Sequence, residues 1–378
     1  MNCLNLPALD GANPLAYLAA LGTLVVLTKS DRSLKLGWHA GVRWTPFLQS
    51  DVLLEKERVI SLLAEVLRGQ EVQDENENKR KSAQEEHDKA KKLLKNEKDK
   101  LKELKLHGKD RNQYFEANIK PLEQAEAEAR SKWLAALKNA VPSPELAIGQ
   151  RPDCTIAEFR EHASFILNEA TLNKREALDM LTAFGAEASA KQNDPILLTR
   201  FCFITGSGHQ YFLETARQLM MKVSPSKLNE ALFEPWDYRD EKFTMRWDPV
   251  DDRRYALMDR DPTDPDNKSS TVWMANLLAY RALSLFPCAP YGASFNQACW
   301  PSKEQDGAFS WPIWDKPLSV ATIRSLLWHP AFGQLDISQY RDELHAMGVS
   351  TVFRSHRISV GSSSVNQKIN FTPSIPLF

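Results

Sequence analysis

The chain has 378 residues, of which 43% are hydrophobic and 26% are charged, and its formal net charge is −1. This length and composition predict a globular protein that buries a substantial core without needing disulfide bonds or metal ions for stability. The near-zero net charge excludes a globally basic nucleic-acid-binding chain, but it leaves room for a local basic surface.

The first residues predict a short strand followed by a helix. The stretch LNLPAL has the pattern of the strand. Asn13 is expected to cap the helix, with Pro14 at its first position, because Asn is a favoured N-cap and the fixed φ of Pro suits the first helical turn. The apolar residues that follow extend the predicted helix to about Thr28.

Two strands and a second helix are expected next. The strands should lie at 34–38 and 42–48, and Ser50 or Asp51 should cap a helix whose apolar residues recur at helical spacing. The resulting β-α-β-β-α order matches most of a ferredoxin-like unit within residues 1–70. That fold serves many functions, including RNA recognition and processing, so it does not define one.

Residues 71–140 change character abruptly. Small or apolar residues recur there close to heptad spacing, first before and then after HGKDRN (107–112), which is expected to break the helix. His87 and Glu97 interrupt the first seam, and Pro121 is expected to kink or restart the second arm. The pattern predicts a long antiparallel helical hairpin.

The first arm and tip of this hairpin are basic. Between residues 88 and 111 there are ten Lys or Arg residues and five Asp or Glu residues. Contact with a nucleic-acid backbone would be electrostatic and salt-sensitive, whereas a solvated helix with i,i+4 ion pairs is the alternative. The candidate nucleic-acid-binding residues are Lys89, Lys91, Lys92, Lys95, Lys98, Lys102, Lys105, Lys109 and Arg111.

Residues 141–378 predict a larger mixed body. Helices are expected at 156–167, 173–186 and 269–286, and the alternating tail predicts a β-hairpin. The whole chain therefore predicts an α+β fold, in which a ferredoxin-like N-terminal unit (1–70) and a mixed α/β body (141–378) are interrupted by the helical hairpin (71–140).

The stretch FCFITGSGHQYF (201–212) predicts a strand, a turn and a helix. It is not a G-x-S-x-G elbow, because Thr205 replaces the first glycine, and it lacks the lysine of a P-loop. The turn is either a sharp corner or a contact to one nucleic-acid phosphate at a helix start. Its candidate residues are Gly206, Ser207, Gly208 and His209.

Arginines and aspartates alternate in RWDPVDDRRYALMDRDP. Arg246, Arg253 and Arg254 are candidates for nucleic-acid contact, and buried Arg–Asp pairs are the alternative. The eight histidines show no HxH or HExxH grouping, and the aspartates lack the spacing of a calcium loop. We therefore expect no catalytic residue, no metal site and no cofactor. The ten tryptophans are expected either to pack the core or to stack on bases.

Five scattered cysteines without CxxC spacing indicate reduced thiols. The N-terminus has no basic leader region, and its apolar stretch is too short to span a bilayer. These features predict a cytoplasmic protein without membrane contact.

Several motifs together resemble proteins encoded in type I-U (also called type I-G) CRISPR loci. The N-terminal DGANPLAYLAALGTL is similar to the opening of these proteins. Similar later landmarks lie within residues 195–330: LLTRFCFITGSGHQYFL, LFEPWDY, MRWDPVDDRRYALMDRDP, ALSLFPCAPYG and FSWPIWDKPLSVATIRSLL. The hairpin is not part of the resemblance.

The resemblance implies a non-catalytic subunit of an RNA-guided interference complex, similar to the large-subunit proteins of Cascade. Its implied partners are guide (CRISPR) RNA, target DNA and other Cas subunits, with no small-molecule substrate. In such systems base pairing reads the sequence, while protein reads shape and a short flanking motif. Two alternatives are a protein-interaction scaffold of another antiphage system and a hydrolase or nuclease.

Overall fold

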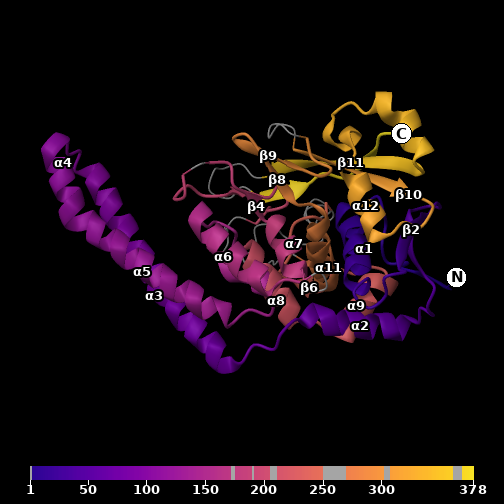
Figure 1. Cartoon of the computed structure of the whole chain (residues 1–378), viewed down its shortest axis with the longest axis horizontal. Helices are drawn as coiled ribbons and strands as arrows, with labels where there is room; N and C mark the ends of the chain where they lie inside the picture. The colour runs from indigo at the N-terminus through magenta and orange to yellow at the C-terminus, as the bar shows by residue number, and fades with distance from the viewer. Residues whose placement is uncertain are drawn as a thin grey trace. The chain divides into compact units, whose positions relative to one another are not determined.

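The computed structural model describes residues 2–171, 175–189, 191–204, 211–249, 270–301, 307–360 and 368–378. Helices and several small sheets share the chain, which confirms the predicted α+β class (Figure 1). The chain divides into two compact units, unit 1 (Met1–Gly69 with Gln150–Phe378) and unit 2 (Gln70–Gly149). Within the described ranges, no helix is both long and apolar enough to cross a bilayer.

The N-terminal segment of unit 1 combines a three-stranded antiparallel sheet with two helices. Its elements are β1 (Asn2–Asn5), α1 (Pro14–Leu27), β2 (Lys35–His39), β3 (Thr45–Ser50) and α2 (Lys56–Arg68). Strand β3 lies between β1 and β2, as in a split β-α-β arrangement. In the described part of the chain no fourth strand pairs with β1, so the ferredoxin-like assignment stays a prediction.

The start of α1 confirms the predicted cap. The side-chain oxygen of Asn13 accepts hydrogen bonds from the backbone N–H groups of Leu15 (2.9 Å) and Ala16 (3.1 Å). Pro14 occupies the first turn, where its missing N–H group leaves no hydrogen bond unmade. The cap fixes where the central helix of unit 1 begins.

Several predicted elements of unit 1 are wrong. The helix predicted at 173–186 ends at Thr182, and Gly185–Ala186 form strand β4. Helix α2 begins at Lys56 and is not capped by Ser50 or Asp51. Ser50 instead ends β3, and its hydroxyl donates a hydrogen bond to Asp31. The stretch 201–204 forms no strand, although all four of its side chains are buried. A run of bulky apolar residues predicts burial, but burial does not require a strand ladder.

Helix α1 packs closely along α11 (Trp273–Ala282) inside unit 1 (Figure 1). All residues of α1 except Val25 are buried. At Gly22 the backbones of the two helices touch, because a Cβ atom at this position would overlap the carbonyl oxygen of Leu278. Only glycine permits such a close approach.

Aromatic side chains fill the core beside this helix pair. The Tyr17 ring of α1 stacks on Trp38 of β2, with 5.6 Å between centroids. The indole N–H groups of Trp311 and Trp314 donate to the carbonyl oxygens of Gly11 (2.8 Å) and Leu36 (2.7 Å), respectively. Six of the ten tryptophans are buried, and only Trp328 is exposed, so core packing explains most of them. The buried ones are Trp38, Trp133, Trp247, Trp300, Trp311 and Trp314.

Strand β11 (Val349–Val360) organises the C-terminal sheet. It pairs antiparallel with β10 (Ala308–Trp314), β12 (Lys368–Phe371) and β13 (Ile375–Pro376). The β11–β12 pairing confirms the predicted hairpin of the tail. Strand β10 is buried along its whole length.

Short helices and two-stranded ribbons complete unit 1. The helices are α6 (Ile156–Glu169), α7 (Glu176–Thr182), α8 (Phe212–Met221), α9 (Pro225–Phe233), α12 (Val320–Leu327) and α13 (Arg341–Ala346). The ribbons pair β4 (Gly185–Ala186) with β5 (Leu197–Leu198), β6 (Asp240–Glu241) with β7 (Ser270–Thr271), and β8 (Cys288–Tyr291) with β9 (Ser294–Gln297). The predicted strand RYALM lies outside the described residues.

Unit 2 is built from two long helices that pack side by side. Its elements are α3 (Asp74–Glu103), α4 (Gly108–Tyr114), a π-helical turn (Phe115–Ile119), α5 (Lys120–Lys138) and a 3-10 turn (Pro144–Ile148). The helix break lies at 104–107, earlier than the predicted 107–112, because α4 already begins at Gly108. Pro121 lies in the first turn of α5, where proline is tolerated.

His87 does not interrupt the seam between α3 and α5. Its ring is buried and stacks on Trp133, with 5.3 Å between centroids and an interplanar angle of 10°. Its Nε2 atom shares a 2.9 Å hydrogen bond with Glu126 Oε1. A buried polar side chain that has a partner is compatible with a packed seam.

We predict that Gly22→Ala lowers the free energy of unfolding of unit 1. The new methyl group would force α1 and α11 apart, and overpacking of this kind costs about 1–3 kcal/mol or more. Chemical denaturation followed by tryptophan fluorescence measures the change. Gly41→Ala is the control, because the nearest atom would lie 3.6 Å from its Cβ. Equal stability of the two variants would contradict the close-approach interpretation.

Candidate nucleic-acid interface

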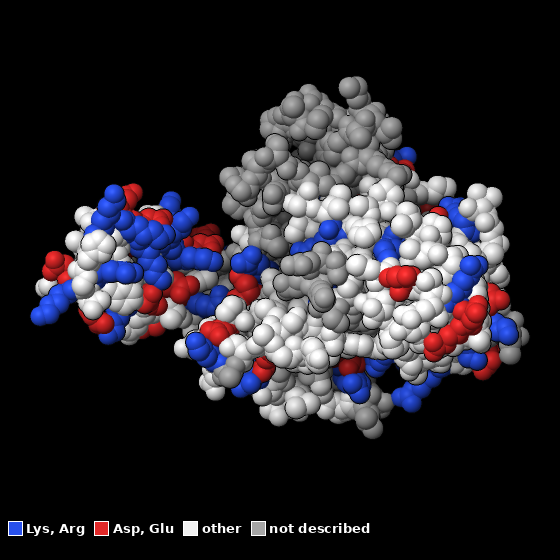
Figure 2. Space-filling model, turned by 90° about the horizontal axis from the view of Figure 1, so that it is seen from above, with Lys and Arg blue, Asp and Glu red and all other residues white. Residues whose placement is uncertain are grey.

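The nine predicted basic residues of the hairpin all lie in unit 2, and together they are called the basic tract: Lys89, Lys91, Lys92, Lys95, Lys98, Lys102, Lys105, Lys109 and Arg111. All are exposed except Lys98, which is half-buried. Figure 2 shows Lys and Arg side chains crowded together on this unit, with Asp and Glu among them. The hairpin therefore presents a locally basic surface although the whole chain is nearly neutral.

Helical spacing aligns four of these lysines along one side of α3. Lys91, Lys95, Lys98 and Lys102 follow the i, i+4, i+7, i+11 pattern of a single helix face. At 1.5 Å per residue they span about 17 Å, which is roughly five nucleotide steps along one strand of duplex DNA. The spacing suits several phosphates on one strand.

Ion pairs divide the basic tract into two groups. Lys98 pairs with Glu123 at 2.7 Å, and Lys102 pairs with Asp99 at 2.9 Å. The hydrogen bond from Lys102 lowers the pKa of the Asp99 carboxyl below its usual range. The positive charge of Lys95 lowers this pKa by a smaller amount. Among the described residues, no carboxylate forms an ion pair with the seven others: Lys89, Lys91, Lys92, Lys95, Lys105, Lys109 and Arg111.

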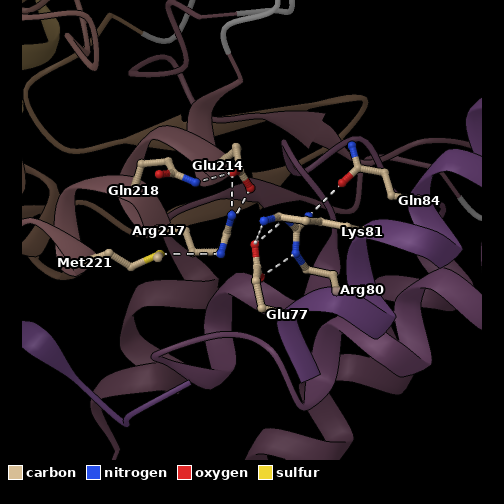
Figure 3. A network of polar contacts seen from close by, with 8 residues as sticks. All are labelled: Glu77, Arg80, Lys81, Gln84, Glu214, Arg217, Gln218 and Met221. Atoms are coloured by element: carbon tan, nitrogen blue, oxygen red, sulfur yellow. Dashed lines mark hydrogen bonds and ion pairs between the residues drawn. The ribbon is translucent and has the colours of Figure 1, made fainter. Parts of the chain in front are cut away.

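Two arginines outside the basic tract are already neutralised, and Figure 3 shows both. Within unit 2, Arg80 donates to both carboxylate oxygens of Glu77 at 2.9 Å. Within unit 1, Arg217 donates to Glu214 at 2.9 and 2.6 Å. Since a bidentate carboxylate occupies each guanidinium fork, neither arginine is a candidate for phosphate binding.

The other predicted binding residues belong to unit 1. Arg246 is half-buried, lies in the left-handed region (φ 61°) and donates its backbone N–H to Thr244 Oγ1 at 3.0 Å. The remaining candidates lie outside the described residues. They are Gly206, Ser207, Gly208, His209, Arg253 and Arg254.

A buried carboxylate, which the sequence did not single out for this role, joins two of the quoted motifs. Asp248 of MRWDP is 1% exposed. It accepts hydrogen bonds from Asn13 Nδ2 of DGANP and from the Tyr238 hydroxyl, both at 2.9 Å. These contacts give Asp248 a structural role, since a buried charge is stable only when polar groups surround it. The sequence alone gives no indication that Asn13 and Asp248 lie in contact.

We predict that Asn13→Asp is far more destabilising than Asn13→Ser. Both substitutes can cap α1, but a second carboxylate would face the buried Asp248 and remove the hydrogen bond that the Asn13 side chain donates to it. The aspartate variant should lose at least about 2 kcal/mol more of its unfolding free energy at neutral pH. Urea denaturation of both variants measures this difference. Equal losses would show that Asn13 acts only as a cap.

Three of the buried cysteines, Cys202, Cys288 and Cys299, lie in surroundings that disfavour a thiolate. All five are free thiols, and only Cys3 is exposed. Burial raises the pKa of the Cys202 and Cys288 thiols from 9.0 to about 12, and it also raises the pKa of the Cys299 thiol well above its usual value. A reactive cysteine needs a lowered pKa, so these thiols are structural. In the described ranges no group of three His, Cys, Asp or Glu side chains could hold a metal ion.

The raised thiol pKa values predict a loss of stability at alkaline pH. Above pH 9 the unfolded chain releases thiol protons that the folded chain keeps, so unfolding becomes more favourable as the pH rises towards 12. Each such thiol should lower the unfolding free energy by about 1.4 kcal/mol per pH unit. Urea denaturation between pH 8 and pH 11 measures this loss.

The burial of four of the cysteines can be tested by chemical labelling. At pH 8, a thiol reagent should modify Cys3 quickly and the other four only on unfolding. Rapid labelling of all five would contradict their burial.

No protein-family model and no curated protein sequence matches the chain.

Proposed function

We propose that the protein is a non-catalytic nucleic-acid-binding subunit of a Cascade-like, RNA-guided CRISPR interference complex in antiviral defence. The observation that carries the proposal is the set of seven exposed side chains of the basic tract that form no ion pair with a carboxylate among the described residues. The motifs that resemble proteins of type I-U loci supply the class of complex. The subunit acts in the cytoplasm with guide RNA, target DNA and other Cas subunits.

Unpaired surface lysines favour contact with a phosphate backbone. An exposed lysine that already pairs with a carboxylate gains little by exchanging it for a phosphate, whereas an unpaired one adds its full attraction. Side chains spread along a helix neutralise successive phosphates without reading bases. This sequence-independent binding suits a subunit of an RNA-guided complex, in which base pairing provides the specificity.

We predict that removing three unpaired lysines weakens nucleic-acid binding. The Lys89→Gln, Lys91→Gln, Lys92→Gln variant should bind duplex DNA at least tenfold more weakly. The slope of log K against log salt should become shallower by about 2–3, since each lost phosphate contact contributes about 0.9. Fluorescence anisotropy over a range of salt concentrations measures both quantities.

The matched control removes three lysines of unit 2 that are paired: Lys79, Lys81 and Lys120. It makes the same change in net charge but should alter affinity less than about twofold, because their carboxylate partners already offset them. If both triple variants lost affinity equally, net charge rather than the basic tract would govern binding. If the wild-type protein bound neither RNA nor DNA at low salt, alone or with partner subunits, the proposed function would be wrong.

A further inference from the structure

One face of the three-stranded sheet in unit 1 is turned away from the core. Residues that lie opposite one another in β1, β2 and β3 point to the same face of the sheet, and Tyr17 of α1 stacks on the face that carries Trp38. The strand residues of the other face, called the outer sheet face, include no Asp or Glu. Its main side chains are Cys3, Asn5, Lys35, His39, Phe47 and Gln49.

Two aromatic rings are stacked on the outer sheet face. The His39 ring lies over the Phe47 ring, with 4.1 Å between centroids and an interplanar angle of 15°. Phe47 is buried and His39 is exposed, so the ring face of His39 that Phe47 does not cover is open to solvent. Gly37 makes room for this pair, because a Cβ atom there would lie 2.6 Å from the Phe47 ring. The pair therefore forms a flat platform on which a further ring can stack.

Two basic side chains flank the platform. Lys35 lies four residues before His39 on β2, and Arg43 lies in the turn between β2 and β3. Both are exposed, and neither side chain forms an ion pair or a hydrogen bond with another described residue. Their positive charge is therefore not offset within the described part of the chain.

An aromatic platform beside basic side chains suits a single-stranded nucleic acid. Its unstacked bases can lie on the ring while its phosphates contact the cations. A duplex keeps its bases stacked on one another, so it cannot use the platform.

We propose that the outer sheet face binds a single-stranded segment of nucleic acid, with one base stacked on His39 and the backbone beside Lys35 and Arg43. This inference rests on the proposed function and adds a contact surface in unit 1.

The first test measures binding of the full-length protein to a labelled single-stranded RNA and to a duplex DNA by fluorescence anisotropy. His39→Ala should lower single-strand affinity about fivefold or more, because the stacked base loses its ring. Lys35→Gln should make the slope of log K against log salt shallower by about 0.7, the contribution of one phosphate contact on a single strand. Duplex affinity should be unchanged in both variants.

The conservative variant His39→Phe separates stacking from other effects, since it keeps a ring at this position. It should retain most of the single-strand affinity. Unchanged affinity in His39→Ala, or an equal loss in His39→Phe, would overturn the inference.

Cys3 provides a direct measure of occupancy, because it is the exposed thiol of the chain and lies on the outer sheet face. It is opposite Gln49, which is opposite Lys35, so two strand spacings of about 4.8 Å separate Cys3 from Lys35. Saturating single-stranded RNA should slow the reaction of Cys3 with a thiol reagent, and duplex DNA should not. No protection by the RNA, or equal protection by the duplex, would overturn the inference.

His356→Ala is the matched control. His356 is also an exposed histidine of a strand, β11, but it does not belong to the outer sheet face, and its ring stacks on no other described ring. The variant should leave both single-strand affinity and Cys3 protection unchanged. A loss equal to that of His39→Ala would show a general effect of removing a histidine and would overturn the inference.

The outcomes separate the outer sheet face from the proposed function. If the Lys89, Lys91, Lys92 variant loses affinity but His39→Ala does not, this inference fails and the proposed function stands. If the wild-type protein binds no nucleic acid, both fail.

Discussion

The contact between Gly22 and the backbone at Leu278 is the constraint on which unit 1 depends. It lets α1 pack directly against α11, so that an early helix and one about 250 residues later share one core. Because α1 is buried on nearly all sides, the N-terminal segment cannot bury its apolar surface alone. Residues 1–69 therefore form one compact unit with 150–378 rather than a separate domain.

Polar contacts then fix the register of this core. The indole N–H groups of Trp311 and Trp314 bind backbone carbonyls of the N-terminal segment, and Asn13 binds the buried Asp248. These residues fall within the sequence motifs quoted above, and their contacts are structural. The motifs therefore describe how unit 1 is packed. The charges of the basic tract come from unit 2, where none of the quoted motifs lies.

Local signals made some features predictable and long-range contacts made others unpredictable. The Asn13 cap and the two long helices of unit 2 follow from neighbouring residues, and both are seen. The strand predicted at 201–204 is wrong, because these apolar side chains are buried against aromatic rings that are distant in the sequence, such as Trp300, and not within a sheet. His87 interrupts the apolar pattern of α3 but not the seam, because its partners lie on α5. For the basic tract, the sequence showed the charge but not which lysines are paired.

In its proposed role, the basic tract would attract a nucleic-acid strand from a distance. At physiological salt this attraction is screened beyond about 8 Å, and it does not distinguish one phosphate from another. An excess of charge on a helix surface therefore suits the capture of a strand. The specificity must come from another source, which base pairing supplies in an RNA-guided complex.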